Sequence, residues 1–274
     1  MTQPAEDLKQ SVYKHWNRES CGEGYAESDG EFDLSAQERE RYALEPYLAP
    51  FAKFGEAAGA DVLEIGVGMG ADHLRWARER PKSLSGVDLT PRAIEFTRTR
   101  IEDESLSSDL RVGDAERLPF ADDSFDIVYS WGVLHHSPNT EICFREVRRV
   151  LRTGGRARIM VYHTRSLVGL MLWSRYGLLA GRPFRSMADI YHHHLESPGT
   201  KAYSRFECEA MFRRAGFSKV NVRVQLSHGD LLEGAVGARH QSGLLSLAKR
   251  LWPRPLLRRI AGRWGLYLLI NAEK

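Results

Sequence analysis

The sequence contains few cysteines and no long apolar run. Its three cysteines, Cys21, Cys143 and Cys208, lie far apart and form no C-x-x-C motif. This pattern argues against a disulfide framework and indicates a reducing compartment. The longest strongly apolar run, residues 166–173, is much shorter than the roughly 20 residues that a membrane-spanning helix needs. The first residues also lack the apolar core of a secretion signal. We therefore expect a cytoplasmic protein.

Charge is nearly balanced over the chain as a whole but not along it. The net charge is +3, yet residues 241–274 contain seven lysines and arginines against one acidic residue. The segment 241–263 is also rich in leucine, so it could lie on an anionic membrane surface as a peripheral contact. The alternative is a helix that covers the core and exposes a basic face, which we favour. Aromatic residues do not alternate with the basic ones, and a nucleic-acid partner is therefore not expected.

Short apolar runs alternate with helix-length segments from residue 61 onward. The predicted strands are 61–65, 83–88, 109–113, 125–130, 155–163, 219–225 and 264–274, and the predicted helices between the early strands are 71–80, 91–101 and 140–151. Residues 7–18 and 36–58 also have helical patterns, with a bend expected at Pro46 or Pro50 in the second. Such alternation predicts an α/β fold with a parallel sheet covered on both faces.

A glycine-rich turn with a preceding acid follows the first predicted strand. Glu64, Gly66, Gly68 and Gly70 give the spacing G-x-G-x-G, whereas dinucleotide enzymes favour G-x-G-x-x-G, which rests a pyrophosphate on the helix end. The turn and its acid suit a ligand that has a cationic amino-acid end and no phosphates.

Acids also end the next two predicted strands. Asp88 ends the second, where a carboxylate can accept hydrogen bonds from both hydroxyls of a ribose. Asp114 ends the third, where the acid and the N–H of Ala115 can read an adenine edge. Acids at consecutive strand ends in this order indicate a nucleoside-binding site rather than isolated loop caps.

The segments VLEIGVGMGAD, GVDLT, GDAERLPFADDSFDIVYSWGVLHH and EVRRVLRTGGRARI resemble the motif series of class I S-adenosylmethionine-dependent methyltransferases. They are most similar to the branch that includes ubiquinone and menaquinone C-methyltransferases and many small-molecule methyltransferases. The resemblance implies a doubly wound, Rossmann-like seven-stranded sheet in the order 3-2-1-4-5-7-6, with the last strand antiparallel. It also implies S-adenosyl-L-methionine as cofactor, S-adenosyl-L-homocysteine as product and no required metal.

The resemblance assigns roles to the residues at the strand ends. Glu64, Gly66 and Gly68 would line the methionine moiety beside Met69, Asp88 would hold the ribose, and Leu89 would pack on the adenine that Asp114 and Ala115 frame. Ser130 and Trp131, which end the fourth strand, would pass under the sulfonium. The chain then divides into a helical N-terminal lid (1–58), the cofactor-binding core (59–163), an irregular insertion that caps the acceptor (164–203) and the C-terminal part of the core (204–274).

Histidines near the strand ends are the candidates for acceptor chemistry. A general base helps when the acceptor is a phenol, a hydroxyl or an acidic carbon, and histidine is the usual choice. His135 and His136 follow the fourth strand, where this branch commonly carries similar residues. That favours a structural role for at least one and leaves His136 as a candidate base. Tyr162 and His163 end the fifth strand, on the edge where ligands bind, and are candidates to contact the acceptor.

The insertion contains the run Tyr191, His192, His193 and His194. Consecutive side chains point in different directions, so at most two of these histidines could bind one ion, and the spaced Cys and His pairs of structural zinc sites are missing. We therefore expect no metal there. Because the insertion should cover the acceptor pocket, we expect one of these side chains to face the acceptor, and we assign His192 to catalysis.

The sequence thus predicts methyl transfer to a small-molecule or lipid-like acceptor by in-line displacement. The fourth-strand loop reads SWGV rather than the N/D-P-P-Y of enzymes that methylate nucleobase amines. Three other functions compete: a membrane-associated quinone or lipid methyltransferase, a non-catalytic cofactor-binding module, and an NAD-dependent oxidoreductase, which the glycine spacing disfavours. The acceptor atom and the oligomeric state stay open.

Overall fold

The structure is a computed structural model of the chain, and it describes residues 5–23, 27–28, 31–233, 252–259 and 262–274. Most of the basic segment 241–263 falls outside these residues, so its expected membrane contact stays a prediction. Among the described residues, no helix has the length and apolarity needed to cross a membrane.

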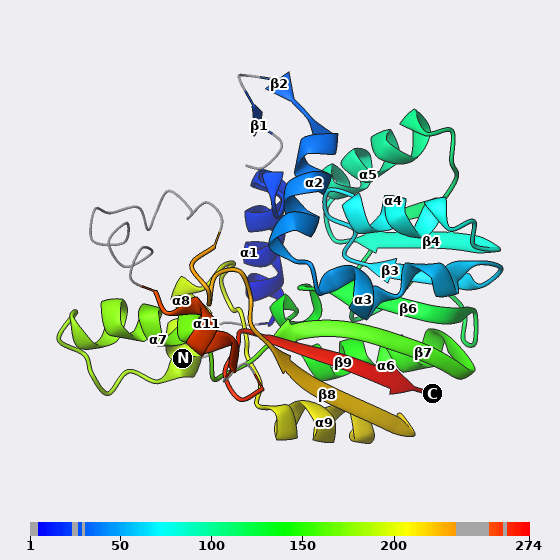
Figure 1. Cartoon of the computed structure of the whole chain (residues 1–274). Helices are drawn as coiled ribbons and strands as arrows, with labels where there is room; N and C mark the ends of the chain where they lie inside the picture. The colour runs from blue at the N-terminus through cyan, green and yellow to red at the C-terminus, as the bar shows by residue number, and fades with distance from the viewer. Residues whose placement is uncertain (1–4, 24–26, 29–30, 234–251, 260–261) are drawn as a thin grey trace.

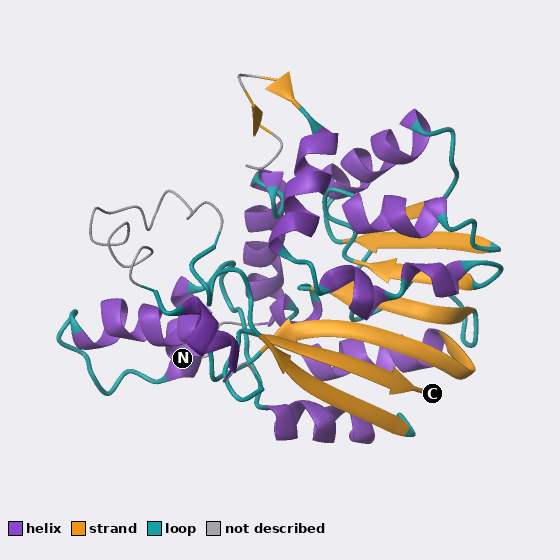
Figure 2. Ribbon diagram, in the orientation of Figure 1, coloured by secondary structure: helices purple, strands orange, loops and turns teal. Residues whose placement is uncertain are grey.

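Seven strands form the central sheet (Figures 1 and 2). They are β3 (Asp61–Ile65), β4 (Ser83–Asp88), β5 (Asp109–Val112), β6 (Phe125–Trp131), β7 (Leu151–Tyr162), β8 (Lys219–Gln225) and β9 (Tyr267–Glu273). Their order is β5-β4-β3-β6-β7-β9-β8, and β9 runs antiparallel to both neighbours. This confirms the predicted order 3-2-1-4-5-7-6 and the Rossmann-like class. Strands β3 to β7 are parallel, so their carboxyl ends meet at one edge.

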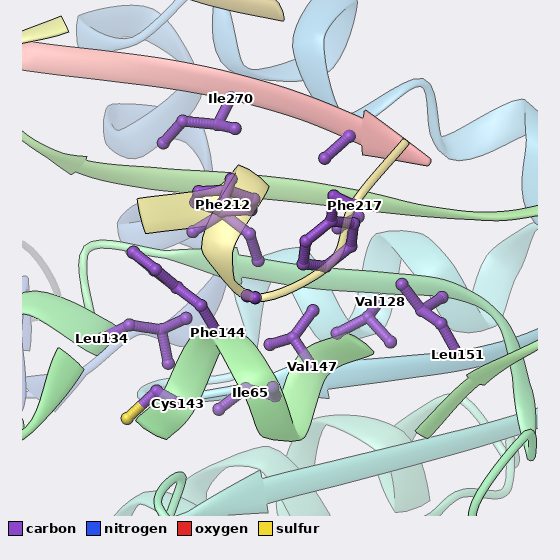
Figure 3. Close-up of a cluster of buried hydrophobic side chains, with 14 of the residues drawn as sticks. Ile65, Val128, Leu134, Cys143, Phe144, Val147, Leu151, Phe212, Phe217 and Ile270 are labelled. Carbon is purple, nitrogen blue, oxygen red and sulfur yellow. The ribbon is translucent and has the colours of Figure 1, made fainter. Parts of the chain in front are cut away.

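Helices cover both faces of the sheet, and each face has its own apolar cluster. On one face, α6 (Thr140–Val150) and α9 (Arg205–Arg214) pack on the strands through Phe144, Val147 and Phe212 (Figure 3). On the other, α4 (Ala71–Arg78), α5 (Pro91–Asp103) and α3 (Leu48–Ala52) enclose Trp76 and Tyr129. The two clusters follow from the alternation of side chains along a strand, which sends neighbouring residues to opposite faces.

The N-terminal region is helical, but it is more broken than predicted. It contains α1 (Ala5–Arg18), a short pair of strands β1 (Glu27–Ser28) and β2 (Glu31–Phe32), and α2 (Leu34–Leu44). The helical pattern expected over 36–58, with a bend at Pro46 or Pro50, consists of three separate elements: α2 ends at Leu44, just before Pro46, and α3 and the 3₁₀ helix η2 (Phe54–Ala57) follow. The left-handed backbone of Lys53 separates α3 from η2.

The insertion is also more regular than predicted. It folds into α7 (Leu167–Trp173), the π-helical turn η4 (Ser174–Leu178) and α8 (Met187–His194), which lie with α11 (Arg254–Arg259) beyond one end of the sheet (Figure 1). A buried aspartate anchors this group, because Asp230 accepts hydrogen bonds from the backbone N–H groups of Leu167, Val168 and Leu266. The irregular insertion was predicted because these helices are short and weakly patterned.

Candidate active site

One cavity of about 340 Å³ opens at the carboxyl edge of the parallel strands. Its lining divides into two connected halves. One half consists of the glycine loop and the acids at the ends of β3, β4 and β5. The other half consists of side chains from α1, α2, the ends of β6 and β7, the segment after α8 and the start of β9. Among them are Trp16, Arg41, Trp131, Tyr162, Glu196 and Tyr267. A ligand in the first half therefore has open access to the second.

The glycine loop has the geometry that its spacing predicts. Gly66, Gly68 and Gly70 all have positive φ angles, of 80°, 52° and 78°. A Cβ on Gly66 would lie 2.1 Å from Val133 Cγ2, and a Cβ on Gly70 would lie 2.8 Å from the backbone of Thr97. Glycine is therefore required at both positions by conformation and by space. The loop leads directly into α4, whose first two residues, Ala71 and Asp72, line the cavity.

The acids at the next two strand ends also line the cavity, and both are already hydrogen-bonded. Asp88 accepts the backbone N–H groups of Gly68, at 3.2 Å, and of Thr90, at 2.9 Å. Burial raises the pKa of Asp88, and these hydrogen bonds act in the opposite direction. Asp114 accepts a hydrogen bond from Lys9 of α1 at 2.6 Å, a contact that the sequence gave no reason to expect. The N-terminal helix therefore reaches the cofactor half of the cavity.

Nine of the ten residues that the resemblance assigned to the cofactor line the cavity: Glu64, Gly66, Gly68, Met69, Asp88, Leu89, Asp114, Ala115 and Trp131. Ser130 does not line it. Its hydroxyl is fully buried and donates to the carbonyl of Ile65 at 2.8 Å. Because side chains alternate along β6, only one of Ser130 and Trp131 can point into the cavity. Ser130 instead ties β6 to β3.

In the second half of the cavity, His136 lies between two hydroxyl groups and a carboxylate. Its Nδ1 lies 2.8 Å from Ser197 Oγ and 3.1 Å from Thr200 Oγ1, and its Nε2 lies 3.3 Å from Glu196 Oε2. Nε2 makes no hydrogen bond to the described part of the chain, and both His136 and Glu196 line the cavity. Burial acts to raise the pKa of Glu196, but the neighbouring His136 and Tyr162 hold it below its ordinary value. Glu196 is therefore a carboxylate at neutral pH.

Tyr162 and His163 are separated by the pleat of β7. Tyr162 lines the cavity, and its ring stacks on Tyr267 with centroids 6.0 Å apart. His163 points away from the cavity, and its Nδ1 lies 3.0 Å from the carbonyl oxygen of Gly265. Of the two residues predicted to contact the acceptor, only Tyr162 lines the cavity, and an acceptor contact of His163 stays a prediction. Consecutive strand residues point to opposite faces, so the pair could not act together.

The histidine run on α8 does not reach the cavity. Tyr191 is buried, with its hydroxyl 2.8 Å from Ser166 Oγ. His193 pairs with the carboxylate of Asp189. The ring of His194 stacks on that of Tyr176, with centroids 3.9 Å apart. His192 is also absent from the lining, and its contact with the acceptor stays a prediction. The chain turns after α8, and Glu196, two residues past the run, is the side chain that enters the cavity.

Sequence reasoning missed a buried charge network that joins α2 to the cavity wall. Asp72, directly after the glycine loop, accepts hydrogen bonds from Arg41 at 2.9 and 2.7 Å and from the hydroxyls of Tyr42 and Tyr129. Arg41 also lies 3.6 Å from Glu45. The only sequence signal was an acid at the first turn of α4, which is common at helix starts and names no partner.

His135, His136 and Glu196 are the one group of three potential metal ligands in the described ranges, with ligand atoms within 4.8 Å of one another. The two imidazole rings lie close together, with centroids 4.2 Å apart and planes tilted by 43°. His136 also uses Nδ1 for hydroxyl groups. This arrangement fits a hydrogen-bonded base better than two rings that converge on one ion.

The lining suits a nucleoside that has a cationic amino-acid end. Three acids stand at adjacent strand ends, and the two permanently cationic side chains described in the lining, Lys9 and Arg41, are both paired with carboxylates. Neither is left over for a phosphate. Residues 63–159 match the family described as a methyltransferase domain. Together with the strand order, this defines a class I S-adenosylmethionine-dependent methyltransferase domain in this part of the chain.

Comparisons with particular proteins agree on the class. The chain is 32% identical over 138 residues to methyltransferase GfsG of Streptomyces halstedii, which covers 50% of this chain and 48% of that protein. It is 36% identical over 121 residues to a fatty-acid O-methyltransferase of Mycolicibacterium smegmatis, covering 44% and 43%. The matches span about half the length of these curated relatives, and they do not single out the quinone branch.

A solved structure shows the same fold over almost the whole chain. It is a methyltransferase from Thermotoga maritima described as a possible histamine N-methyltransferase, with a TM-score of 0.53, 19% identity, and coverage of 96% of this chain and 99% of that one. At this level of identity the similarity shows a shared fold.

Proposed function

We propose that the protein transfers a methyl group from S-adenosylmethionine to a hydroxyl group of an apolar small molecule. The observation that carries this proposal is the single cavity that joins the glycine loop to His136 and Glu196. S-adenosylmethionine supplies a methyl group that its sulfonium has already activated. The protein then has to align the acceptor, exclude water and remove the proton of the hydroxyl.

The hydrogen bonds around His136 leave Nε2 free to act as the base. Thr200 Oγ1 donates its only proton to the carbonyl of Ser197 at 2.7 Å, so it can only accept from His136 Nδ1. With the ring proton on Nδ1, the lone pair lies on Nε2, a buried atom next to Glu196 at the wall of the cavity. Nε2 takes the proton of the acceptor hydroxyl, and Glu196, 3.3 Å away, stabilises the imidazolium that forms.

The rest of the acceptor half fits an apolar or aromatic molecule. Trp16, Trp131, Tyr162 and Tyr267 line it, and aromatic rings supply large apolar surface with a few polar groups. Two relatives, a fatty-acid O-methyltransferase and an erythromycin 3''-O-methyltransferase, support O-methylation of acceptors of this kind by their names. A membrane-bound lipid or quinone acceptor is the alternative, for which co-sedimentation with anionic vesicles is the test.

A labelled-methyl assay with a panel of hydroxylated lipids, phenols and macrolides tests the proposal. His136→Gln should lower kcat by about 10²–10⁴-fold, the usual contribution of a general base, and leave the affinity for S-adenosylhomocysteine within about threefold. His193→Gln, on the exposed side of α8, is the matched control and should keep full activity. Equal losses in both variants would refute the role of His136.

The competing functions give different results in the same experiments. Tight binding of S-adenosylhomocysteine without methyl consumption with any acceptor would favour a non-catalytic module. Thermal stabilisation by a nicotinamide cofactor, with none by S-adenosylhomocysteine, would favour an oxidoreductase.

A further inference from the structure

Glu64 is joined to a buried histidine that the sequence did not single out. His73, on α4, has no exposed surface, and its Nδ1 lies 3.0 Å from Glu64 Oε2. Its Nε2 lies 2.8 Å from Ser108 Oγ, which in turn donates to the carbonyl of Leu84 at 3.1 Å. The three side chains thus form a line from the cavity wall, where Glu64 lies, to the half-buried Ser108.

The sheet leaves space for this line. A Cβ on Gly86, in β4, would lie 2.8 Å from His73 Cε1, so the imidazole lies directly against the backbone of the strand. Any other residue at position 86 would displace the ring. His73 is therefore held in one place by the backbone next to it as well as by its two hydrogen bonds.

Counting protons along the line gives two consistent arrangements. When Ser108 donates to Leu84, its oxygen can only accept, so His73 Nε2 carries the ring proton and Nδ1 presents a lone pair. The 3.0 Å contact with Glu64 is then a hydrogen bond only if Glu64 is protonated. When the Ser108 hydroxyl turns to Nε2, the ring proton moves to Nδ1 and donates to an ionised Glu64. The second arrangement contains one proton fewer, and His73 is neutral in both.

The surroundings favour the protonated arrangement while no cation is near Glu64. Burial and then the charges of Asp72 and Asp88 raise the pKa of Glu64 well above its ordinary value, and Arg41 acts in the opposite direction. Burial lowers the pKa of His73 to about 3, with Asp72 acting to raise it. Burial thus disfavours the charged form of both groups. A cation that docks on the cavity side of Glu64 reverses this balance, because it stabilises the carboxylate.

We propose that Glu64, His73 and Ser108 form a proton relay that ionises Glu64 when the cationic amino-acid end of the cofactor binds. The proton of Glu64 passes to Nδ1 of His73 while the Nε2 proton leaves past Ser108 to solvent, so each binding event releases one proton. His73 is a positioning residue: it contacts no ligand and supplies the N–H that holds the charged carboxylate. The relay rests on the proposed binding of S-adenosylmethionine.

Calorimetry with two ligands tests the relay. S-adenosylhomocysteine contains the amino-acid end, whereas 5′-methylthioadenosine retains the adenosine and the sulfur but lacks that end. Titrations at pH 7 in buffers of different ionisation enthalpy count the protons released. We expect up to about one proton with S-adenosylhomocysteine and none with 5′-methylthioadenosine. Glu64→Gln should abolish the release. The affinity for S-adenosylhomocysteine should also rise with pH, approaching tenfold per unit below the pKa of Glu64.

Variants at position 73 separate the relay from a packing role. His73→Phe keeps an aromatic ring without nitrogens and should weaken S-adenosylhomocysteine about 10- to 100-fold, the range of a hydrogen bond to a charged group, while 5′-methylthioadenosine changes less than about threefold. His73→Gln, whose amide can donate to Glu64, should recover part of the loss. Binding without proton release, or equal losses for both ligands, would overturn the relay alone. If neither ligand binds the wild-type protein, the proposed function fails and the relay with it.

Discussion

The buried pair of Arg41 and Asp72 allows a quantitative test of how the N-terminal region is held on the sheet. Asp72 is 3% exposed, and two of its four donor contacts come from Arg41, which is 19% exposed. Burial acts to raise the pKa of Asp72, but the charge and hydrogen bonds of Arg41 bring it below its ordinary value. The side chain is therefore an ion at neutral pH, and its stability depends on the arginine.

Replacing Arg41 with Met should cost about 3 kcal/mol of unfolding free energy. Breaking a buried ion pair by removing one partner typically costs about 3–5 kcal/mol, because the remaining charge stays buried. The lower end of this energy range applies to Arg41, since Tyr42 and Tyr129 still donate hydrogen bonds to Asp72. For a chain of this size the loss corresponds to a fall in Tm of roughly 5 °C. Urea denaturation of the wild type and the variant measures it.

A double-mutant cycle isolates the pair. Asp72→Asn alone should lower the free energy of unfolding by about 2 kcal/mol, because Glu45 stays 3.6 Å from the arginine. The loss in the double variant should be smaller than the sum of the two single losses by at least about 1 kcal/mol. The exposed pair Arg213–Glu209 on α9 is the control, where Arg213→Met should cost under about 0.5 kcal/mol. Additive losses, or a loss below about 1 kcal/mol for Arg41→Met, would refute this account of the pair.

Further predictions concern the glycine loop and the pH dependence of stability. Gly66→Ala should abolish S-adenosylhomocysteine binding and lower Tm, because its Cβ would meet Val133. Gly68→Ala, with open space around it, should lower the free energy of unfolding by only about 1–2 kcal/mol. Thermal-shift measurements with and without ligand compare the two variants. Asp61 has its pKa lowered to about 2 by Ser83 and then, against burial, by Arg152 and Lys82. A carboxylate with a depressed pKa stabilises the fold above its unfolded pKa of about 3.9 and loses this effect toward pH 2. Asp61→Asn should therefore lower the free energy of unfolding by about 1–2 kcal/mol at pH 7, after allowance for its exposed partners, and by little near pH 2. Urea denaturation at the two pH values measures this difference. Equal losses at both pH values would contradict the role of the Asp61 carboxylate.

The cofactor half of the site could be predicted from the sequence because its signals are local. Gly66 and Gly68 occupy backbone conformations that other residues adopt at a cost, and Asp88 and Asp114 follow apolar runs that read as strands. Parallel strands bring their carboxyl ends to one edge, so residues far apart in sequence have predictable neighbours. Ser130 was the exception, because the side to which it points depends on the phase of the pleat.

The acceptor half could not be predicted in the same way. Glu196, Tyr267 and Trp16 come from three segments with no shared period or spacing, and they meet only because the sheet edge, α1 and the loop after α8 converge. The histidine run is unusual in composition, yet its side chains pack around α8 or lie on its surface.

The sequence by itself determined the class of fold and, through a family resemblance, the strand order. It also determined the glycine loop and the acids of the cofactor half. These features depend on backbone conformation or on residues that are next to one another in the chain. Only the tertiary structure decided which of Tyr162 and His163 faces the cavity, that Glu196 accompanies His136, and that Arg41 neutralises Asp72. These contacts join residues up to tens of positions apart, and their partners are chosen by burial and charge in three dimensions. The connection of Glu64 through His73 to Ser108 belongs to the same group. A serine in the loop before a strand acquires a role only when the fold places it next to a buried imidazole.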